Sequence, residues 1–362
     1  MTMMTTHTRH ASKKISRNRL LAAIVVAFGV FALVVAAGVT TGFNTKQEVV
    51  LSGRTMGTTY HIKAVVSGKM SADALGLAVT RRLEAINRSM SVYDPESEIS
   101  RFNRAGKGVA VPVSGDLLTV FSVGTRIYDL TEGAWDATVG PLVTLWGFGP
   151  GKAEERFPRE DEVAHALSRV GFSAISRKGK GALVKDRQGL YLDFGSIAKG
   201  YGVDAVAALL REKKIAHFLV EIGGEVYGEG SRLDGKPWRV GINTPRRGAM
   251  VGDPFQVRSL KGQALATSGD YRNYRNVGGR IWTHVINPRT GYPVENGVTS
   301  ASVLADSAVF ADGLATALMV MGPETGIALV NRLKGVECLL IVRKPDGALE
   351  VSASDGWVAR HP

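Results

Sequence analysis

Asp312 and Thr316 are the residues whose types and spacing point most directly to chemistry. They lie four positions apart in an apolar, alanine-rich segment, so a helix there would place both side chains on one face. A buried carboxylate is unfavourable unless it is paired or coordinates a cation. Carboxylate and hydroxyl oxygens suit Mg²⁺ or Ca²⁺ rather than zinc. The pair fits a divalent-cation site, and it also fits a structural Asp312 bonded to Thr316 or to an arginine.

A second candidate segment is the sequence LDFGSIAKGY at 192–201. It leads from an expected strand through a glycine into an expected helix, and helix N-termini behind glycine-rich turns suit phosphate groups. Lys199 adds a positive charge, and Asp193 lies at the strand end, where it could meet a cation or a ring N–H. The glycine spacing matches neither the dinucleotide-binding fingerprint nor the P-loop. The segment indicates a phosphate or pyrophosphate contact.

His284 is the histidine best placed for proton transfer. It opens the sequence HVINPRTG, in which the chain breaks at Asn287-Pro288 and turns at Gly291. Such a histidine could orient or deprotonate a hydroxyl group. A single histidine is more often a structural residue, and that reading stays open.

Three further segments could contact a flat ligand. Tyr93, before an Asp-Pro turn, could stack on a ring. Trp135 could form a second stacking surface, and Asp136 beside it could accept a hydrogen bond. The glycine that follows Met56 would let backbone N–H groups approach a ligand. Taken alone, each segment also fits an ordinary turn or loop.

The elements that must position these residues are a mixture of strands and helices, judged from period-2 and period-3.6 hydrophobic patterns. The expected helices are 72–90, 116–130 (capped by Ser114), 160–170, 196–213, 307–321 and 325–333. The expected strands are 59–66, 182–186, 189–194, 217–222, 238–242, 255–260, 282–286, 299–304 and 336–342. Runs of strands with scattered helices indicate an α+β fold rather than a doubly wound parallel sheet. We expect one domain over residues 49–362.

The N-terminal region is expected to be a targeting segment rather than part of this fold. Residues 20–41 begin with an uncharged apolar run, and roughly 20 helical residues span the roughly 30 Å hydrocarbon core of a bilayer. Basic residues in segment 1–19 place the N-terminus in the cytoplasm by the positive-inside rule. We expect a single-pass inner-membrane anchor, or a cleaved signal segment, followed by a linker at 42–48.

Composition limits the function classes. The chain has 362 residues, of which 44% are hydrophobic and 22% charged, which indicates a globular rather than a disordered protein. The formal charge is +12, yet no dense Lys/Arg tract with interleaved aromatics is present, so nucleic-acid binding is not expected. A basic surface suits an anionic ligand or membrane, or is simply solvated. The single cysteine, Cys338, is expected to be buried.

Eight short motifs follow one another along the chain: MGT at 56–58, YDP at 93–95, AWD at 134–136, DFGSIAKG at 193–200, GGE at 223–225, SGD at 268–270, HVINPRTG at 284–291 and ADGLAT at 311–316. Taken together and in this order, they resemble the ApbE family of FAD:protein FMN transferases. Two positions depart from the family pattern. Asn287 stands where many relatives have aspartate, which removes a carboxylate, and Trp135 stands where many have phenylalanine, which keeps an aromatic wall.

The resemblance implies a T-fold-like α+β domain with a mostly antiparallel sheet. It implies FAD contacts from Met56, Tyr93, Ala134, Trp135, Asp136, Asp193, Lys199 and Ile286. It further implies Mg²⁺ ligands from Asp312, Thr316 and the backbone carbonyl of Ser196. His284 would lie near the reacting phosphate.

The resemblance also implies a reaction, a set of partners and a location. The FMN moiety of FAD would move to a Thr or Ser hydroxyl of an acceptor flavoprotein, with AMP released and Mg²⁺ required. The expected acceptors are subunits of membrane redox complexes, met on the periplasmic side. Two alternatives stay open, namely an FAD pyrophosphatase, in which water replaces the hydroxyl, and a non-enzymatic flavin-binding module.

Overall fold

The computed structural model describes residues 46–68, 70–149, 156–246, 254–271, 274–277 and 279–359. The predicted anchor at 20–41 and the first part of the predicted linker lie outside them. No helix within these ranges is both long enough and apolar enough to span a bilayer. Among them, residues 47–66 and those from 70 onward form one compact unit, to which the following description applies.

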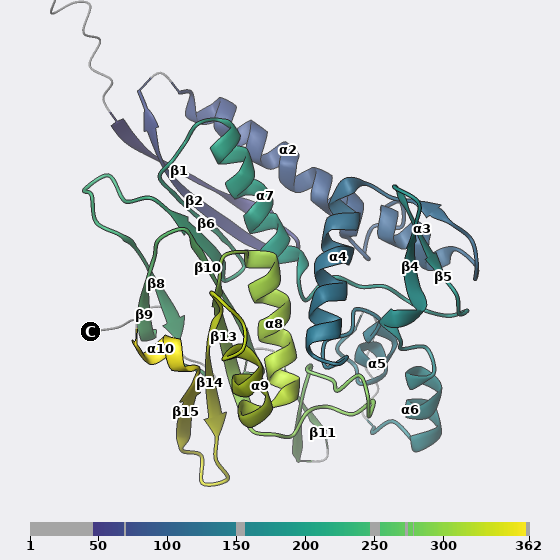
Figure 1. Cartoon of the computed structure of the whole chain (residues 1–362). Helices are drawn as coiled ribbons and strands as arrows, with labels where there is room; N and C mark the ends of the chain where they lie inside the picture. Colours follow the sequence, from purple (N-terminus) through teal and green to yellow (C-terminus); the bar gives the residue numbers. More distant parts are fainter. Residues whose placement is uncertain are drawn as a thin grey trace, which may run out of the picture. The chain divides into compact units, whose positions relative to one another are not determined.

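An eight-stranded sheet forms the centre of this unit, in the order β1-β2-β6-β7-β10-β13-β14-β15 (Figure 1). Its strands are β1 (Lys46–Thr55), β2 (Thr58–Ser67), β6 (Phe218–Ile222), β7 (Glu225–Glu229), β10 (Gln263–Gly269), β13 (Val298–Ala305), β14 (Glu337–Arg343) and β15 (Leu349–Ala353). From β2 to β15 each neighbouring pair runs antiparallel. The predicted α+β fold with a mostly antiparallel sheet is therefore confirmed.

Three smaller sheets accompany the large one. They are β3-β5-β4, the ribbon β8-β9 and the ribbon β11-β12. Their bounds are β3 (Val111–Pro112), β4 (Ile175–Lys178), β5 (Ala182–Lys185), β8 (Trp238–Asn243), β9 (Pro254–Leu260), β11 (Tyr274–Val277) and β12 (Arg280–Thr283).

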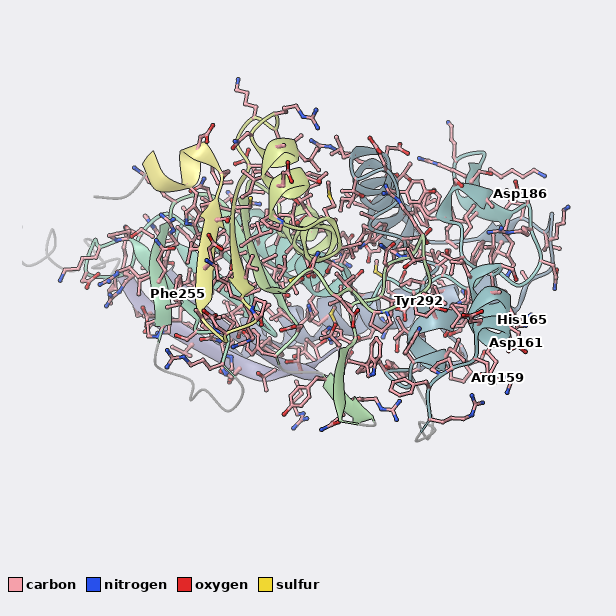
Figure 2. All side chains as sticks on the ribbon, turned by 90° about the horizontal axis from the view of Figure 1, so that it is seen from below. Arg159, Asp161, His165, Asp186, Phe255 and Tyr292 are labelled. Carbon is pink, nitrogen blue, oxygen red and sulfur yellow. The ribbon has the colours of Figure 1, made fainter. Side chains whose placement is uncertain are left out.

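The six predicted helices are present, and each agrees with the prediction to within three residues at either end. They are α2 (Ala72–Met90), α4 (Gly115–Leu130), α6 (Glu160–Leu167), α7 (Ala198–Glu212), α8 (Ala308–Met321) and α9 (Pro323–Val330). Helix α6 is clearly amphipathic, with Val163 and Ala166 buried and Asp161 and His165 exposed on the outside (Figure 2). Three short helices were not predicted, namely α3 (Glu98–Arg104), α5 (Gly140–Leu145) and α10 (Asp355–Ala359).

The core lies on both faces of the central strands. Helix α8 packs on β10 and β13, and α7 packs on β6, β7 and α8. All eight residues of β13 are buried, because its other face is covered by a second apolar cluster that includes Ile242, Leu260 and Trp357. Cys338 on β14 is fully buried, as predicted.

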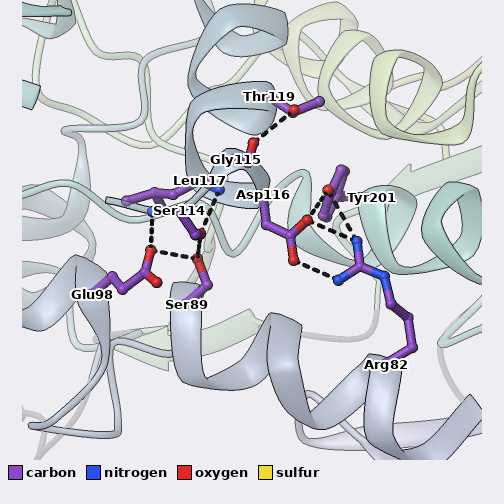
Figure 3. Close-up of polar contacts among 9 residues, drawn as sticks. All are labelled: Arg82, Ser89, Glu98, Ser114, Gly115, Asp116, Leu117, Thr119 and Tyr201. Atoms are coloured by element: carbon purple, nitrogen blue, oxygen red, sulfur yellow. Dashed lines mark hydrogen bonds and ion pairs between the residues drawn. The ribbon is translucent and has the colours of Figure 1, made fainter. Parts of the chain in front are cut away.

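A polar contact at the start of α4 joins three helices. Ser114 caps α4, as predicted, by accepting a hydrogen bond from Leu117 N. Next to the cap, Arg82 of α2 binds both carboxylate oxygens of Asp116, and Tyr201 of α7 donates to Asp116 Oδ1 at 2.6 Å (Figure 3). The contact fixes α7, whose first turn carries the candidate phosphate-binding segment.

Two strand predictions need correction. Residues 189–194 contain no strand, because the backbone of Leu192 is hydrogen-bonded to the side chain of Asn103 rather than to a neighbouring strand. The strand predicted at 282–286 ends at Thr283. Beyond it the chain folds into a turn, and Ile286 forms only an isolated bridge with Pro293.

Candidate active site

A cavity of about 670 Å³ gathers most of the residues that the sequence singled out. Ten of the twelve predicted site residues line it: Ala134, Trp135, Asp136, Asp193, Ser196, Lys199, His284, Ile286, Asp312 and Thr316. They come from loops, from the first turn of α7 and from α8. Met56 and Tyr93 do not line it.

Asp312 reaches from α8 to the first turn of α7. Its Oδ2 accepts a hydrogen bond from Gly200 N at 2.9 Å, and its Oδ1 lies 3.6 Å from Lys199 Nζ. The two helices come this close only because residue 200 is glycine, since a Cβ there would lie 2.8 Å from Asp312 Cβ. The carboxylate and the candidate phosphate-binding turn are therefore neighbours.

Thr316 lies one helical turn further along α8 and faces the sheet. Its Oγ1 is 3.0 Å from Ser268 Oγ at the end of β10. The hydroxyl of Ser196 accepts a hydrogen bond from Trp135 Nε1 at 3.0 Å. These contacts hold the hydroxyl-bearing walls of the cavity in place.

Glu225, at the start of β7, is a candidate site residue that the sequence analysis did not select. Its Oε1 accepts a hydrogen bond from Lys199 Nζ at 2.8 Å, while Oε2 is buried without a hydrogen-bond partner in the described part of the chain. Burial, with a further contribution from the charge of Asp312, raises the pKa of Glu225 to about 8. Its place in the GGE motif was the signal that could have identified it.

Lys199 thus lies between two buried carboxyl groups. Burial disfavours its ammonium form, but the charges of Asp312 and Glu225 outweigh this effect and raise its pKa. Burial also raises the pKa of Asp312. One ammonium group faces two carboxyl groups, so a fully ionised cluster carries a net negative charge.

The chemistry of these donors fits Mg²⁺. Within the described ranges, no three or more His, Cys, Asp or Glu side chains are grouped to hold a metal. The predicted set needs only one of them, since it consists of Asp312, Thr316 and the carbonyl of Ser196. All three are hard oxygen donors, and a cation would offset the excess negative charge beside Lys199.

The loop at 134–138 is braced by its own side chains. Asp136 Oδ1 accepts hydrogen bonds from the backbone N and Oγ1 of Thr138 at 2.6 and 2.5 Å, and Oδ2 accepts one from Phe172 N at 3.1 Å. Trp135 is only 2% exposed and packs edge-on against Phe172. Both residues border the cavity, but most of their bonding capacity is used within the protein.

Met56 and Tyr93 lie elsewhere. Met56 and Gly57 form the two-residue turn between β1 and β2, and both have positive φ, at 49° and 73°, as a type I′ hairpin requires. The Met56 side chain packs on the core beside Gly202. Tyr93 is 79% exposed. Tyr191, which the sequence analysis passed over, packs against Gly140 of the cavity wall.

His284 enters the cavity directly after β12. The β11-β12 ribbon rests on Trp146, whose ring lies 5.2 Å from that of Trp282, and Phe148 meets the His284 ring edge-on at 6.2 Å. Beyond it, the Asn287 side chain accepts a hydrogen bond from Arg289 N at 2.9 Å. Asn287 therefore closes the turn that its position in the sequence indicated.

The sequence of this chain is similar to those of known proteins over most of its length. A model described as the ApbE family matches residues 56–340. The chain is 43% identical over 312 residues to the FAD:protein FMN transferase of Vibrio cholerae, covering 85% of this chain and 91% of that protein. It is 36% identical over 334 residues to the protein of the same name from Haemophilus influenzae, covering 90% and 95%.

The fold of this chain is also similar to the folds of solved structures. The flavin transferase ApbE from Vibrio cholerae superimposes with a TM-score of 0.79 at 40% identity, covering 87% of this chain and 99% of that one. The apo form of the flavinyl transferase ApbE from Pseudomonas stutzeri also has a TM-score of 0.79, at 35% identity, covering 87% and 96%.

Proposed function

Because the chain belongs to the ApbE family, we propose that it transfers the FMN moiety of FAD to a Thr or Ser hydroxyl of an acceptor flavoprotein and releases AMP in a Mg²⁺-dependent reaction. One observation carries this proposal. Asp312 lies against the first turn of α7, next to Lys199, in a cavity of about 670 Å³. A helix N-terminus, an ammonium group and a set of hard oxygen donors together suit a diphosphate.

The protein groups around the diphosphate have distinct roles in this proposal. Lys199 and the first turn of α7 bind the phosphate oxygens. Asp312, Thr316 and the carbonyl of Ser196 would hold Mg²⁺, which when bound neutralises charge on the diphosphate. Glu225 holds the Lys199 side chain in place through the 2.8 Å contact between its Oε1 and Lys199 Nζ.

His284 is the group proposed to orient or deprotonate the acceptor hydroxyl. The hydroxyl oxygen attacks the phosphorus on the FMN side in line. A bond from this oxygen to phosphorus forms while the bond to the AMP oxygen breaks, and the hydroxyl proton goes to His284 or to solvent. Because phosphoryl transfer depends mainly on positioning and charge neutralisation, the chain needs no covalent nucleophile of its own.

The test is to mix the enzyme with FAD, Mg²⁺ and a purified candidate acceptor, and to follow the products by mass spectrometry and nucleotide chromatography. The proposal expects an acceptor whose mass rises by one FMN moiety, together with an equal amount of AMP. Free FMN with AMP would instead identify an FAD pyrophosphatase. FAD that stays bound and intact would identify a flavin-binding module.

We further propose that the enzyme is anchored in the inner membrane by residues 20–41 and faces the periplasm, where it modifies flavoprotein subunits of membrane redox complexes. The uncharged run and the preceding basic residues support this placement. Membrane fractionation, with protease digestion of intact and permeabilised cells, tests it. Digestion only after the inner membrane is opened would contradict it.

A further inference from the structure

Asn103 of α3 forms an unusual pair with the segment that leads into the cavity. Its Nδ2 donates to Leu192 O at 2.8 Å, and its Oδ1 accepts from Leu192 N at 2.7 Å. Opposite residues of antiparallel strands exchange two hydrogen bonds in this way, but here a side-chain amide replaces one strand. Leu192 is fully buried, so its N–H and C=O would otherwise have no compensation for the loss of water.

Lys185 of β5 supports the same segment from the other side. Its Nζ donates to Asn103 O at 2.9 Å and to Leu190 O at 3.1 Å. Asn103 O belongs to the last turn of α3, where carbonyl groups have no partner within the helix. The Lys185 side chain is buried, and its ammonium group lies 5.2 Å from the centre of the Phe102 ring. One buried cation therefore joins α3, β5 and residue 190.

The segment held in this way ends in the cavity wall. Asp193 follows Leu192 directly and lines the cavity. Its backbone N donates to Ala137 O at 2.8 Å, which links it to the loop at 134–136 that also lines the cavity. Its carboxylate accepts a hydrogen bond from Gly195 N at 2.8 Å, at the entrance to the α7 turn. The position of Leu192 therefore helps to set the positions of Asp193 and of the loop at 134–136, both of which line the cavity.

We propose that Asn103, supported by Lys185, is a positioning residue for FAD binding. It replaces a missing strand neighbour, fixes Leu192, and so sets the positions of Asp193 and of the loop at 134–137. Asn103 itself does not line the cavity. The inference rests on the proposed function, because it assumes that FAD occupies this cavity.

The test compares Asn103→Ala with the wild-type full-length enzyme in FAD turnover and in FAD binding measured by flavin fluorescence. Loss of both hydrogen bonds is expected to raise the KM and Kd for FAD about 10-fold or more. The kcat at saturating FAD should stay within about threefold of wild type, the signature of lost uniform binding. The increase in Tm caused by FAD should shrink in parallel.

Two further variants separate positioning from general stability. Lys185→Met keeps the apolar stem but removes the ammonium group, and it should raise the KM for FAD in the same direction. It also keeps the proposal testable if Asn103→Ala does not fold. Ile99→Ala is the matched control, since Ile99 is fully buried on the same helix and has no hydrogen bond to residues 190–193. It should lower Tm and leave the KM for FAD within about twofold of wild type.

Three outcomes would contradict these expectations in different ways. An unchanged KM for FAD in both Asn103→Ala and Lys185→Met would overturn the positioning role. An equal rise in KM in Ile99→Ala would assign the effect to loss of stability and would also overturn it. A wild-type enzyme that neither binds nor turns over FAD would contradict the proposed function itself.

Discussion

At the scale of single residues, the site is governed by one ammonium group between two buried carboxyl groups. Lys199 is 2.8 Å from Glu225 and 3.6 Å from Asp312. Both carboxyl groups are almost completely buried, so water screens little of the interaction between either group, when ionised, and a charge placed beside it. A substitution at Lys199, Glu225 or Asp312 is therefore expected to affect the site through the change in charge as well as through the change in shape.

Asp312→Ala is expected to lower the rate of Mg²⁺-dependent transfer about 100-fold or more, because a bound metal contributes several kcal/mol of charge stabilisation. Initial rates over a Mg²⁺ titration give the measurement. Ser302→Ala is a suitable control, since this buried hydroxyl on β13 bonds to Thr267 and not to α8. Wild-type rates in Asp312→Ala would refute the metal assignment.

At the scale of elements, the site depends on how closely α7 and α8 approach and on the contact that joins α2, α4 and α7. Gly200 permits the helix approach, and Asp116 is the centre of the contact shown in Figure 3. Neither feature lies within one element. Each can be tested by one substitution with a control on the same type of element.

Gly200→Ala is expected to destabilise the protein by about 1–3 kcal/mol, because the new methyl group would lie 2.8 Å from Asp312 Cβ and against the backbone of Ala308. Gly202→Ala in the same helix is the control. Its methyl group would meet only the ends of the Met56 and Ile222 side chains, and the gain in helix propensity of about 1 kcal/mol offsets that contact. Urea unfolding compares them, and equal loss in both would contradict the close-contact explanation.

Asp116→Asn is expected to reduce the free energy of unfolding by about 1–2 kcal/mol at pH 7. This value allows for the partial exposure of the Arg82–Asp116 pair. The hydrogen bond from Arg82 lowers the pKa of Asp116 below its ordinary value of 3.8. A lowered folded-state pKa means that the pair's stabilisation is present above pH 3.8 and is lost as the pH falls through the folded-state pKa. The wild type should therefore lose more stability on acidification than the variant does.

Urea unfolding at a series of pH values from neutral to acid measures this difference. Asp161→Asn is the control, because Asp161 in the first turn of α6 and Arg159, which precedes the helix, form a highly exposed pair (Figure 2). Exposed pairs contribute little to stability. A wild type and an Asp116→Asn variant that lose stability in parallel would show that the pair does not contribute in this way.

At the scale of the whole molecule, every residue proposed to bind FAD or Mg²⁺ lies after the predicted anchor. The family match begins at residue 56, and β1 begins at Lys46. The proposed FAD and Mg²⁺ site therefore lies within the part of the chain that follows residue 45.

A chain of residues 46–362 is expected to be soluble and to turn over FAD with the same KM as the full-length enzyme in detergent, because the cavity lining begins at Ala134. Sedimentation and initial-rate measurements test this. A KM for FAD raised more than about fivefold in the shorter chain would indicate that the first 45 residues take part in forming the site. Insolubility of the shorter chain would contradict the expectation that it is soluble.

The sequence by itself determined the six longer helices and the residue types that form the candidate site. Long amphipathic periods and caps such as Ser114 are local signals, so α2, α4 and α8 could be predicted closely. Strands β7 and β10 could not be predicted from the sequence. They contain glycine and hydroxyl residues, and their pairing depends on their neighbours in the sheet. The motifs likewise identified Asp312, Lys199 and His284 as residue types at defined spacings.

Only the tertiary structure decided which of these residues meet and what supports them. It brought ten of the predicted site residues to one cavity and left Met56 and Tyr93 outside it. It also brought Glu225 to Lys199 and Asn103 to Leu192, across 26 and 89 positions of the chain. The physical reason is that hydrophobic periodicity reports local burial, whereas charge pairing and shared hydrogen bonds arise only where distant segments pack together.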